Sequence, residues 1–197
     1  MMRRIEALRH LAELGEQLPL VVTCAATSRE LASIADRDNH LYLLDAMGLV
    51  GSVATGIAIG IRDSDIPKVV GIEGDGSLLM NPNVLPTGGY LAPSNLLLVV
   101  LDNHVYSSTA GLPTYADRID LARMAEATGW TVARADDADG LRRAFAELLE
   151  TPGPCFLHVR TEPGNEDGVP KLLVDPVVVG HRFSTWLQER LVARMSR

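Results

Sequence analysis

Short apolar runs alternate with longer helical patterns along the chain. Runs rich in β-branched residues predict strands at residues 20–24, 41–44, 68–73, 95–101, 131–134 and 155–160. Amphipathic or apolar stretches between them predict helices at residues 1–18, 29–35, 47–61, 83–91, 119–128, 137–149 and 176–192. This alternation predicts an α/β fold in three layers, with helices on both faces of a mostly parallel sheet of about six strands.

The runs at 68–73 and 95–101 are apolar throughout instead of alternating with polar residues. Continuous apolar runs are typical of central parallel strands, which are buried on both faces. The segment 164–175 interrupts the pattern with Gly164, Gly168 and Pro170. We expect an irregular segment there, either a plain connection or a lid over a site.

Composition narrows the class of protein. The 197 residues are 47% hydrophobic, which suffices for one domain with a substantial core. The net charge is −7 and the basic residues do not cluster, so nucleic-acid binding is disfavoured. The apolar stretch 46–61 is shorter than the ~20 residues of a membrane span, and no membrane association is expected.

The two cysteines, Cys24 and Cys155, lie far apart and form neither a metal-binding pair nor a disulfide framework. The N-terminal 18 residues carry charges throughout and lack the apolar centre of a signal peptide. Both features predict a reducing, cytoplasmic location.

Two polar loops follow the central apolar runs. Gly74-Asp75-Gly76-Ser77 comes after residues 68–73, and Asp102-Asn103 comes after residues 95–101. Each loop alone is a common turn. However, parallel strands joined by a helix end at the same edge of a sheet, so Asp75 and Asn103 are expected to lie close together. Hard oxygen ligands beside a glycine turn suit Mg²⁺ and a phosphate group.

These loops carry a resemblance to a known family. Residues 74–103 resemble the thiamine diphosphate motif, which starts with Gly-Asp-Gly-Ser and ends in an asparagine close to thirty residues later. Nearly the whole chain is similar to the β subunit of sulfopyruvate decarboxylases and the matching half of phosphonopyruvate decarboxylases. The most specific matches are Gly-Asp-Gly-Ser-Leu-Leu-Met-Asn at 74–81, Leu-Asp-Asn at 101–103 and Tyr-Ser-Ser-Thr at 106–109.

The resemblance implies a Mg²⁺ site and a thiamine diphosphate site. Mg²⁺ would be bound by side-chain oxygens of Asp75 and Asn103 and by the backbone carbonyl of Val105. The cofactor contacts that it implies involve Asp45, Met47, Gly74, Asp75, Gly76, Ser77, Asn103, Val105 and Tyr106.

The resemblance also implies catalytic roles for Met47, Asp45 and Thr109. Met47 lies in Asp-Ala-Met-Gly, which is similar to the family's Gly-Ser-Met-Gly. There the apolar residue bends the cofactor, so that the cofactor's own imino group removes the proton from the thiazolium ring. Without the resemblance, Met47 reads as a core residue at a helix start.

Asp45 and Ala25 stand where the family usually has glycine. Asp45 either caps the following helix or alters substrate choice or proton transfer, while its carbonyl still binds the pyrimidine amino group. Thr109 either faces the substrate, with Ser107 and Ser108, or helps to cap a helix. His104 is interpreted as a surface or packing residue, and His158, inside an apolar strand, as a structural residue.

One essential family residue has no match in this sequence. The glutamate that activates the pyrimidine ring belongs to a separate pyrimidine-binding domain, and neither Glu30 nor Glu73 matches its position. We therefore expect residues 1–197 to form a single diphosphate-binding domain. A separate α subunit would supply the glutamate in an α₂β₂ enzyme, with the cofactor across the interface.

The expected function is that of the β subunit of a thiamine-diphosphate- and Mg²⁺-dependent lyase that decarboxylates a small 2-oxo acid. The alternatives are a carboligase subunit, of the acyloin or acetolactate synthase kind, and a non-catalytic regulatory subunit that binds the cofactor. A nucleotide-binding Rossmann protein is disfavoured because its glycine motif is absent. Recognition of a sulfonate or phosphonate requires Arg or Lys. The sequence alone assigns no basic residue of this chain to the pocket, and the partner subunit is an alternative source.

Overall fold

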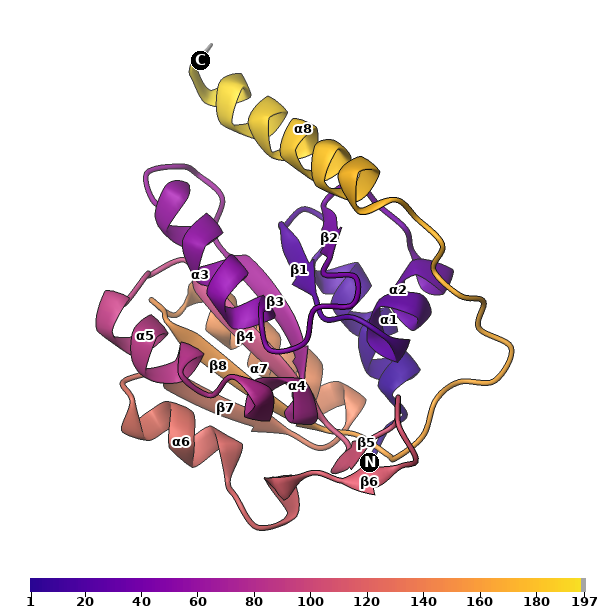
Figure 1. The fold of residues 1–197 in the computed structure, drawn as a ribbon. Helices are drawn as coiled ribbons and strands as arrows, with labels where there is room; N and C mark the ends of the chain where they lie inside the picture. The colour runs from indigo at the N-terminus through magenta and orange to yellow at the C-terminus, as the bar shows by residue number, and fades with distance from the viewer. Residues whose placement is uncertain (196–197) are drawn as a thin grey trace.

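A parallel sheet forms the centre of the molecule. The computed structural model describes residues 1–195, with side chains described through residue 192. Six strands lie in the order β2-β1-β3-β4-β8-β7, and every neighbouring pair is parallel (Figure 1). Their bounds are β1 Leu20–Val22, β2 His40–Tyr42, β3 Val69–Gly74, β4 Leu96–Asp102, β7 Thr131–Ala135 and β8 Cys155–Arg160. The six predicted strands and the α/β class are confirmed.

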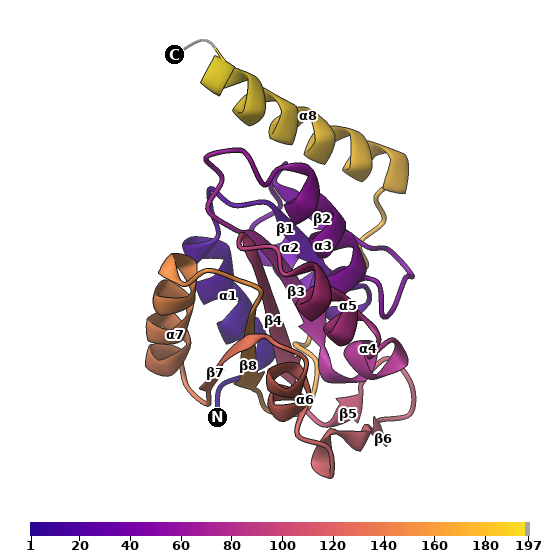
Figure 2. The ribbon, with the colours of Figure 1, turned by 90° about the vertical axis from the view of Figure 1, so that its left-hand side faces the viewer.

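Helices cover both faces of the sheet, as Figure 2 shows edge-on. One face carries α1 (Arg4–Leu14), α2 (Ala26–Ile34) and α7 (Ala138–Glu150), and the other carries α3 (Val50–Gly60), α5 (Val84–Leu91) and α6 (Leu121–Ala127). Alternate side chains of β4 enter the two cores, with Leu97 and Val99 on one side and Leu98 and Val100 on the other. Burial on both faces explains why β4 is apolar throughout.

The chain changes direction across the sheet between β1 and β3. From β1 it passes outward to β2, and from β3 it passes the other way to β4. In open α/β sheets, such a reversal leaves a crevice at the carboxyl ends of the two central strands, where ligands bind. The first turns of α2 and of α4 (Asp75–Met80) begin at this crevice.

Four small elements at this edge were not predicted. They are α4, the hairpin of β5 (Val105–Tyr106) and β6 (Leu112–Pro113), and the 3-10 turn η1 (Tyr115–Asp117). Each is too short for a hydrophobic period to be recognised in the sequence.

The last helix, α8 (Pro176–Met195), lies outside the layers and beside β2 (Figures 1 and 2). Its Val179 and Phe183 are buried, and Arg182 donates to Asp36 at 3.0 Å while its guanidinium lies 5.7 Å from the ring centroid of Tyr42. An irregular connection at residues 161–175 precedes it, as predicted.

Within residues 1–195, the structure contains no helix long and apolar enough to cross a membrane.

A buried lysine holds the opposite edge of the sheet together. The Nζ atom of Lys68 donates to the backbone carbonyls of Ser94 at 2.7 Å and Thr151 at 2.6 Å. Only 1% of Lys68 is exposed, so its ammonium group depends on these carbonyls for solvation. The start of β3 is thereby fastened to the segments that lead into β4 and β8.

We predict that Lys68→Met lowers the free energy of unfolding by about 2–4 kcal/mol, because it removes the two hydrogen bonds that the ammonium group donates to the carbonyls of Ser94 and Thr151. Urea denaturation followed by circular dichroism measures the change. The same substitution at the exposed Lys171 is the matched control and is expected to stay within ~0.5 kcal/mol of the parent. Equal stabilities of the two variants would contradict the structural role of Lys68.

Candidate functional site

The carboxyl ends of β1, β3 and β4 line one cleft. Its wall is formed by residues 23–27 after β1, residues 74–77 at the start of α4, Leu101 near the end of β4, Asn103 directly after β4, and residues 105–108 of the hairpin, together with Arg4 and Met47. The three residues predicted to bind metal, Asp75, Asn103 and Val105, all border this cleft. The parallel topology thus brings together the two polar loops of the sequence.

Asp75 is a buried carboxylate at the first position of α4. The hydroxyl of Thr114 donates to its Oδ2 atom at 2.6 Å. Burial, and to a smaller degree the nearby carboxylate of Asp102, raises the pKa of Asp75 to about 6 against the effect of the Thr114 hydrogen bond. A divalent cation beside this group would favour its charged form, so the site fits a metal ion.

Asn103 and Val105 offer uncharged oxygens beside Asp75. The Oδ1 atom of Asn103 accepts from the backbone N–H of Val105 at 3.1 Å, and the carbonyl of Val105 accepts from the N–H of Ser107 at 3.1 Å. Each oxygen keeps a second lone pair for a ligand. In the described part of the chain, no cluster of three His, Cys, Asp or Glu residues could hold a metal. Amide and carbonyl oxygens would therefore complete the set, and such hard ligands suit Mg²⁺.

Asp102 is directed to a histidine on the neighbouring strand. The Nε2 atom of His158 lies 2.8 Å from Oδ2 of Asp102, and the N–H of His104 donates to Oδ1 at 3.1 Å. Burial opposes the charged form of Asp102, but His158 outweighs this effect and lowers the pKa of the carboxyl. His158 is a buried packing residue, as predicted, and its specific task is to orient the loop that carries Asn103.

Ser77 ties the start of α4 to two other loops. Its hydroxyl oxygen accepts from the N–H of Gly48 at 2.8 Å and lies 3.2 Å from the hydroxyl of Thr23. Glu73 lies behind these groups and accepts from the N–H of Gly74 at 3.2 Å, and burial raises its pKa to about 7. The loop that presents Met47 is thereby held against the start of the predicted phosphate-binding turn.

Steric crowding explains why two positions at the cleft, Gly76 in this turn and Gly48 in the loop beside it, are glycine. A Cβ atom at Gly76 would lie 2.3 Å from the ring of Tyr106, so only glycine allows this ring to pack against α4. At Gly48, whose φ is +73°, a Cβ atom would lie 2.9 Å from Cβ of Asn81. At Gly74, by contrast, a Cβ atom would meet nothing within 4 Å, which leaves room at the cleft for a ligand.

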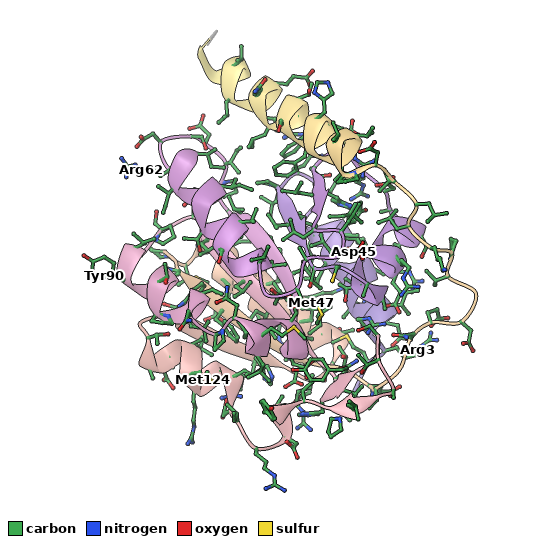
Figure 3. All side chains as sticks on the ribbon, in the orientation of Figure 1. Arg3, Asp45, Met47, Arg62, Tyr90 and Met124 are labelled. Carbon is green, nitrogen blue, oxygen red and sulfur yellow. The ribbon has the colours of Figure 1, made fainter. Side chains whose placement is uncertain are left out.

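Two residues have backbone angles that favour glycine. Ala25 has φ 62° and ψ −131°, and Asp45 has φ 57°. The family that the sequence resembles usually has glycine at both positions, and these angles give the physical reason. Figure 3 shows Asp45 and Met47 close together between α3 and α2. Met47 borders the cleft, whereas Asp45 borders an adjoining hollow that also includes Ala25.

Thr109 is not brought to the wall of the cleft. It is exposed at the turn between β5 and β6, and its hydroxyl donates to the carbonyl of Tyr106 at 2.9 Å. Ser107 and Ser108 from the same segment do border the cleft.

A doubly wound α/β domain with an acidic oxygen site at its strand reversal defines a class of cofactor-binding domains. Residues 23–159 match the model of the thiamine pyrophosphate enzyme, C-terminal TPP binding domain. The chain belongs to this family.

Curated relatives agree with this assignment. The chain is 40% identical over 184 residues to the sulfopyruvate decarboxylase subunit beta of Methanothermobacter thermautotrophicus, covering 93% of this chain and 94% of the relative. It is also 40% identical over 186 residues to the phosphonopyruvate decarboxylase of Streptomyces viridochromogenes, of which it covers 46%.

Solved structures show the same fold. Benzoylformate decarboxylase from Polynucleobacter necessarius matches with a TM-score of 0.72 and 21% identity, over 83% of this chain and 34% of that chain. The 4-hydroxybenzoylformate decarboxylase of Rhodococcus jostii matches with a TM-score of 0.69 and 19% identity, over 83% and 33% of the two chains.

The strained backbone at the cleft yields a prediction. Replacing Ala25 by glycine is expected to raise the free energy of unfolding by about 1 kcal/mol, because the relief of strain exceeds the added entropy of the unfolded chain. Ala32→Gly in the middle of α2 is the control and should lower stability by about 1 kcal/mol. Thermal and urea unfolding measure both variants. A loss of stability in Ala25→Gly would contradict the strain.

Proposed function

We propose that this chain is the diphosphate-binding β subunit of a thiamine-diphosphate- and Mg²⁺-dependent 2-oxo acid decarboxylase, similar to the sulfopyruvate and phosphonopyruvate decarboxylases. The observation that carries the proposal is the buried carboxylate of Asp75, which shares one cleft with Asn103 and Val105 in a chain of this family. The names of the relatives support a lyase that removes CO₂.

In this proposal Asp75 and Asn103 hold Mg²⁺ with side-chain oxygens and Val105 with its carbonyl. The metal links the protein to the diphosphate, whose negative charge the carboxylate alone would repel. The cofactor contacts involve Gly74, Gly76, Ser77 and Tyr106. The N–H groups at the start of α4 and the space beside Gly74 support this assignment.

Thiamine diphosphate, when bound, supplies an electron sink for the negative charge left by departing CO₂. The tasks of this chain are to bind and to orient. Met47 would support the bent shape of the cofactor, and the carbonyl of Asp45 would accept from the pyrimidine amino group. Thr109 would face the substrate from the hairpin turn, where it is exposed.

The activating glutamate would come from a separate α subunit in an α₂β₂ assembly. The two buried glutamates near the cleft are already engaged. Glu30 accepts from Nε of Arg4 at 2.9 Å, and Glu73 accepts from the N–H of Gly74 at 3.2 Å. Residues 1–197 would thus form one diphosphate-binding domain in a cytoplasmic enzyme. The naming of one relative as a subunit beta supports the division between chains.

A carboligase subunit is the second candidate function. Acetolactate synthases 1 and 2 of Nicotiana tabacum are 32% identical to the chain in an alignment of 136 residues that covers 59% of this chain and 20% of each synthase. Both reactions need the same metal and diphosphate site, so the distinction depends on the product. A non-catalytic subunit that only binds cofactor is disfavoured, because Met47 and the three residues proposed to bind the metal all border the cleft.

The first prediction of this proposal concerns the metal. Asp75→Ala should abolish Mg²⁺-dependent binding of thiamine diphosphate, because the diphosphate then lacks its bridge to the protein. Isothermal calorimetry on the complex with the pyrimidine-domain subunit measures this, with Asp117→Ala on the exposed η1 turn as a control of unchanged affinity. Unchanged affinity in Asp75→Ala would reject the metal assignment.

The second prediction concerns Met47. Met47→Ala should lower kcat by at least about tenfold while the affinity for Mg²⁺ and thiamine diphosphate stays within a few-fold, because the side chain orients the rings instead of holding the diphosphate. Met124→Ala, on α6 and outside the set of residues that border the cleft, is the control and should retain kcat. Equal kcat values for the two variants would show that Met47 only fills space.

The third prediction concerns the reaction and the partner. The chain together with a pyrimidine-domain subunit should release CO₂ from a 2-oxo acid and form an aldehyde, whereas the chain alone should show no turnover. Product analysis in a mixture of 2-oxo acids and aldehydes separates decarboxylation from carboligation. Acyloins as the main products would favour the carboligase, and CO₂ release by the chain alone would contradict the proposed partner.

A further inference from the structure

A second hollow adjoins the cofactor cleft and carries basic residues. It is bordered by the first turn of α2, the loop at residues 44–45 and the connection at residues 171–176. Ala25 borders both the cleft and the hollow, and Asp45 belongs to the same loop as Met47. The hollow therefore opens directly beside the place proposed for the reacting rings of the cofactor.

Arg29 and Lys171 bring two positive charges to this hollow. The Nε atom of Arg29 donates to the carbonyl of Ala25 at 3.3 Å, which uses one of the five N–H groups of its guanidinium. Among the side chains that the structure describes, no carboxylate forms an ion pair with either residue. The residues that border the hollow include one acidic side chain, Asp45, and two basic ones, Arg29 and Lys171. The formal charge of its lining is therefore positive.

The segment that carries Lys171 is fastened to the helices below it. Asn165 accepts from Nη2 of Arg4 at 2.8 Å, and the N–H of Glu166 donates to Glu30 at 3.1 Å. Further along, Leu172 and Val174 pack against the core that contains α1 and α2. The connection therefore runs along α2 and closes one side of the hollow (Figure 1).

We propose that Arg29 and Lys171 bind the second anionic group of the substrate, and that the substrate is a 2-oxo acid with a sulfonate or phosphonate on the carbon next to the keto group. This inference rests on the proposed decarboxylase function. A guanidinium without a carboxylate partner and an ammonium group in one hollow can donate several hydrogen bonds to an oxyanion with three oxygens. Because this group does not change during loss of CO₂, its contacts contribute equally to the ground state and the transition state.

Contacts that stabilise the ground state and the transition state equally affect KM and leave kcat nearly unchanged. In the complex with the pyrimidine-domain subunit, Arg29→Gln should raise KM for 3-phosphonopyruvate or 3-sulfopyruvate roughly 10- to 100-fold with little change in kcat. The KM for pyruvate, which lacks the second anion, should stay unchanged. Lys171→Gln should act in the same direction, and Arg29→Lys should recover part of the loss.

Arg62→Gln is the matched control because it removes one positive charge at the end of α3, away from the hollow (Figure 3). It should leave both KM values unchanged. Comparing the two dianionic substrates shows whether the hollow favours the sulfonate or the phosphonate, and a preference for either supports the proposal. Equal changes for pyruvate and the dianions, or no change in Arg29→Gln, would overturn it.

A binding measurement separates this inference from the proposed function. Calorimetry with 3-phosphonopropanoate and with propanoate, on the complex with the pyrimidine-domain subunit, Mg²⁺ and thiamine diphosphate, needs no turnover. Binding of only the dianion, weakened about tenfold or more by Arg29→Gln, would support the anion site even if no 2-oxo acid were decarboxylated. Turnover of pyruvate alone, with no binding of the dianion, would keep the decarboxylase and overturn the anion site.

Discussion

Buried acidic groups at the ends of two adjacent strands impose the main constraint on this molecule. Glu73, Asp75 and Asp102 lie within the carboxyl ends of β3 and β4 or directly after them, and all three are buried. Carboxylates are rarely buried unless a partner compensates their charge. The way in which each group is compensated determines what the site can bind.

The charge of each of the three carboxyl groups is compensated in a different way. His158 compensates Asp102 at 2.8 Å, and this fixes the loop that carries Asn103. Burial raises the pKa of Glu73 to about 7, which moves it toward its neutral form, and it becomes part of the support for α4. Asp75 has a hydroxyl partner in Thr114 but no cationic one within the described residues. Our account gives that role to Mg²⁺, and the diphosphate follows because the metal needs further oxygen ligands.

Much of this arrangement follows from the sequence, for physical reasons. Continuous apolar runs identified the central strands, and parallel pairing then placed Asp75 and Asn103 at one edge. The hydrogen bond from His158 to Asp102 was missed, since it depends on the order β4-β8, which hydrophobic periodicity does not contain. The positive φ angles of Ala25 and Asp45 were indicated only by the glycines of the similar family, because neither alanine nor aspartate requires such angles by itself. Arg29 and Lys171 are 142 positions apart (171 minus 29), and only the path of the connection brings them to one hollow.

The central claim is that the oxygens of Asp75, Asn103 and Val105 hold the metal that anchors the diphosphate. The most direct test is a crystal structure of the complex with thiamine diphosphate, grown with Mn²⁺ in place of Mg²⁺ and measured for anomalous scattering. Our account predicts one strong peak, about 2.2 Å from each of these three oxygens and bonded to the diphosphate. A bound diphosphate whose metal touches neither Asp75 nor Asn103 would contradict it.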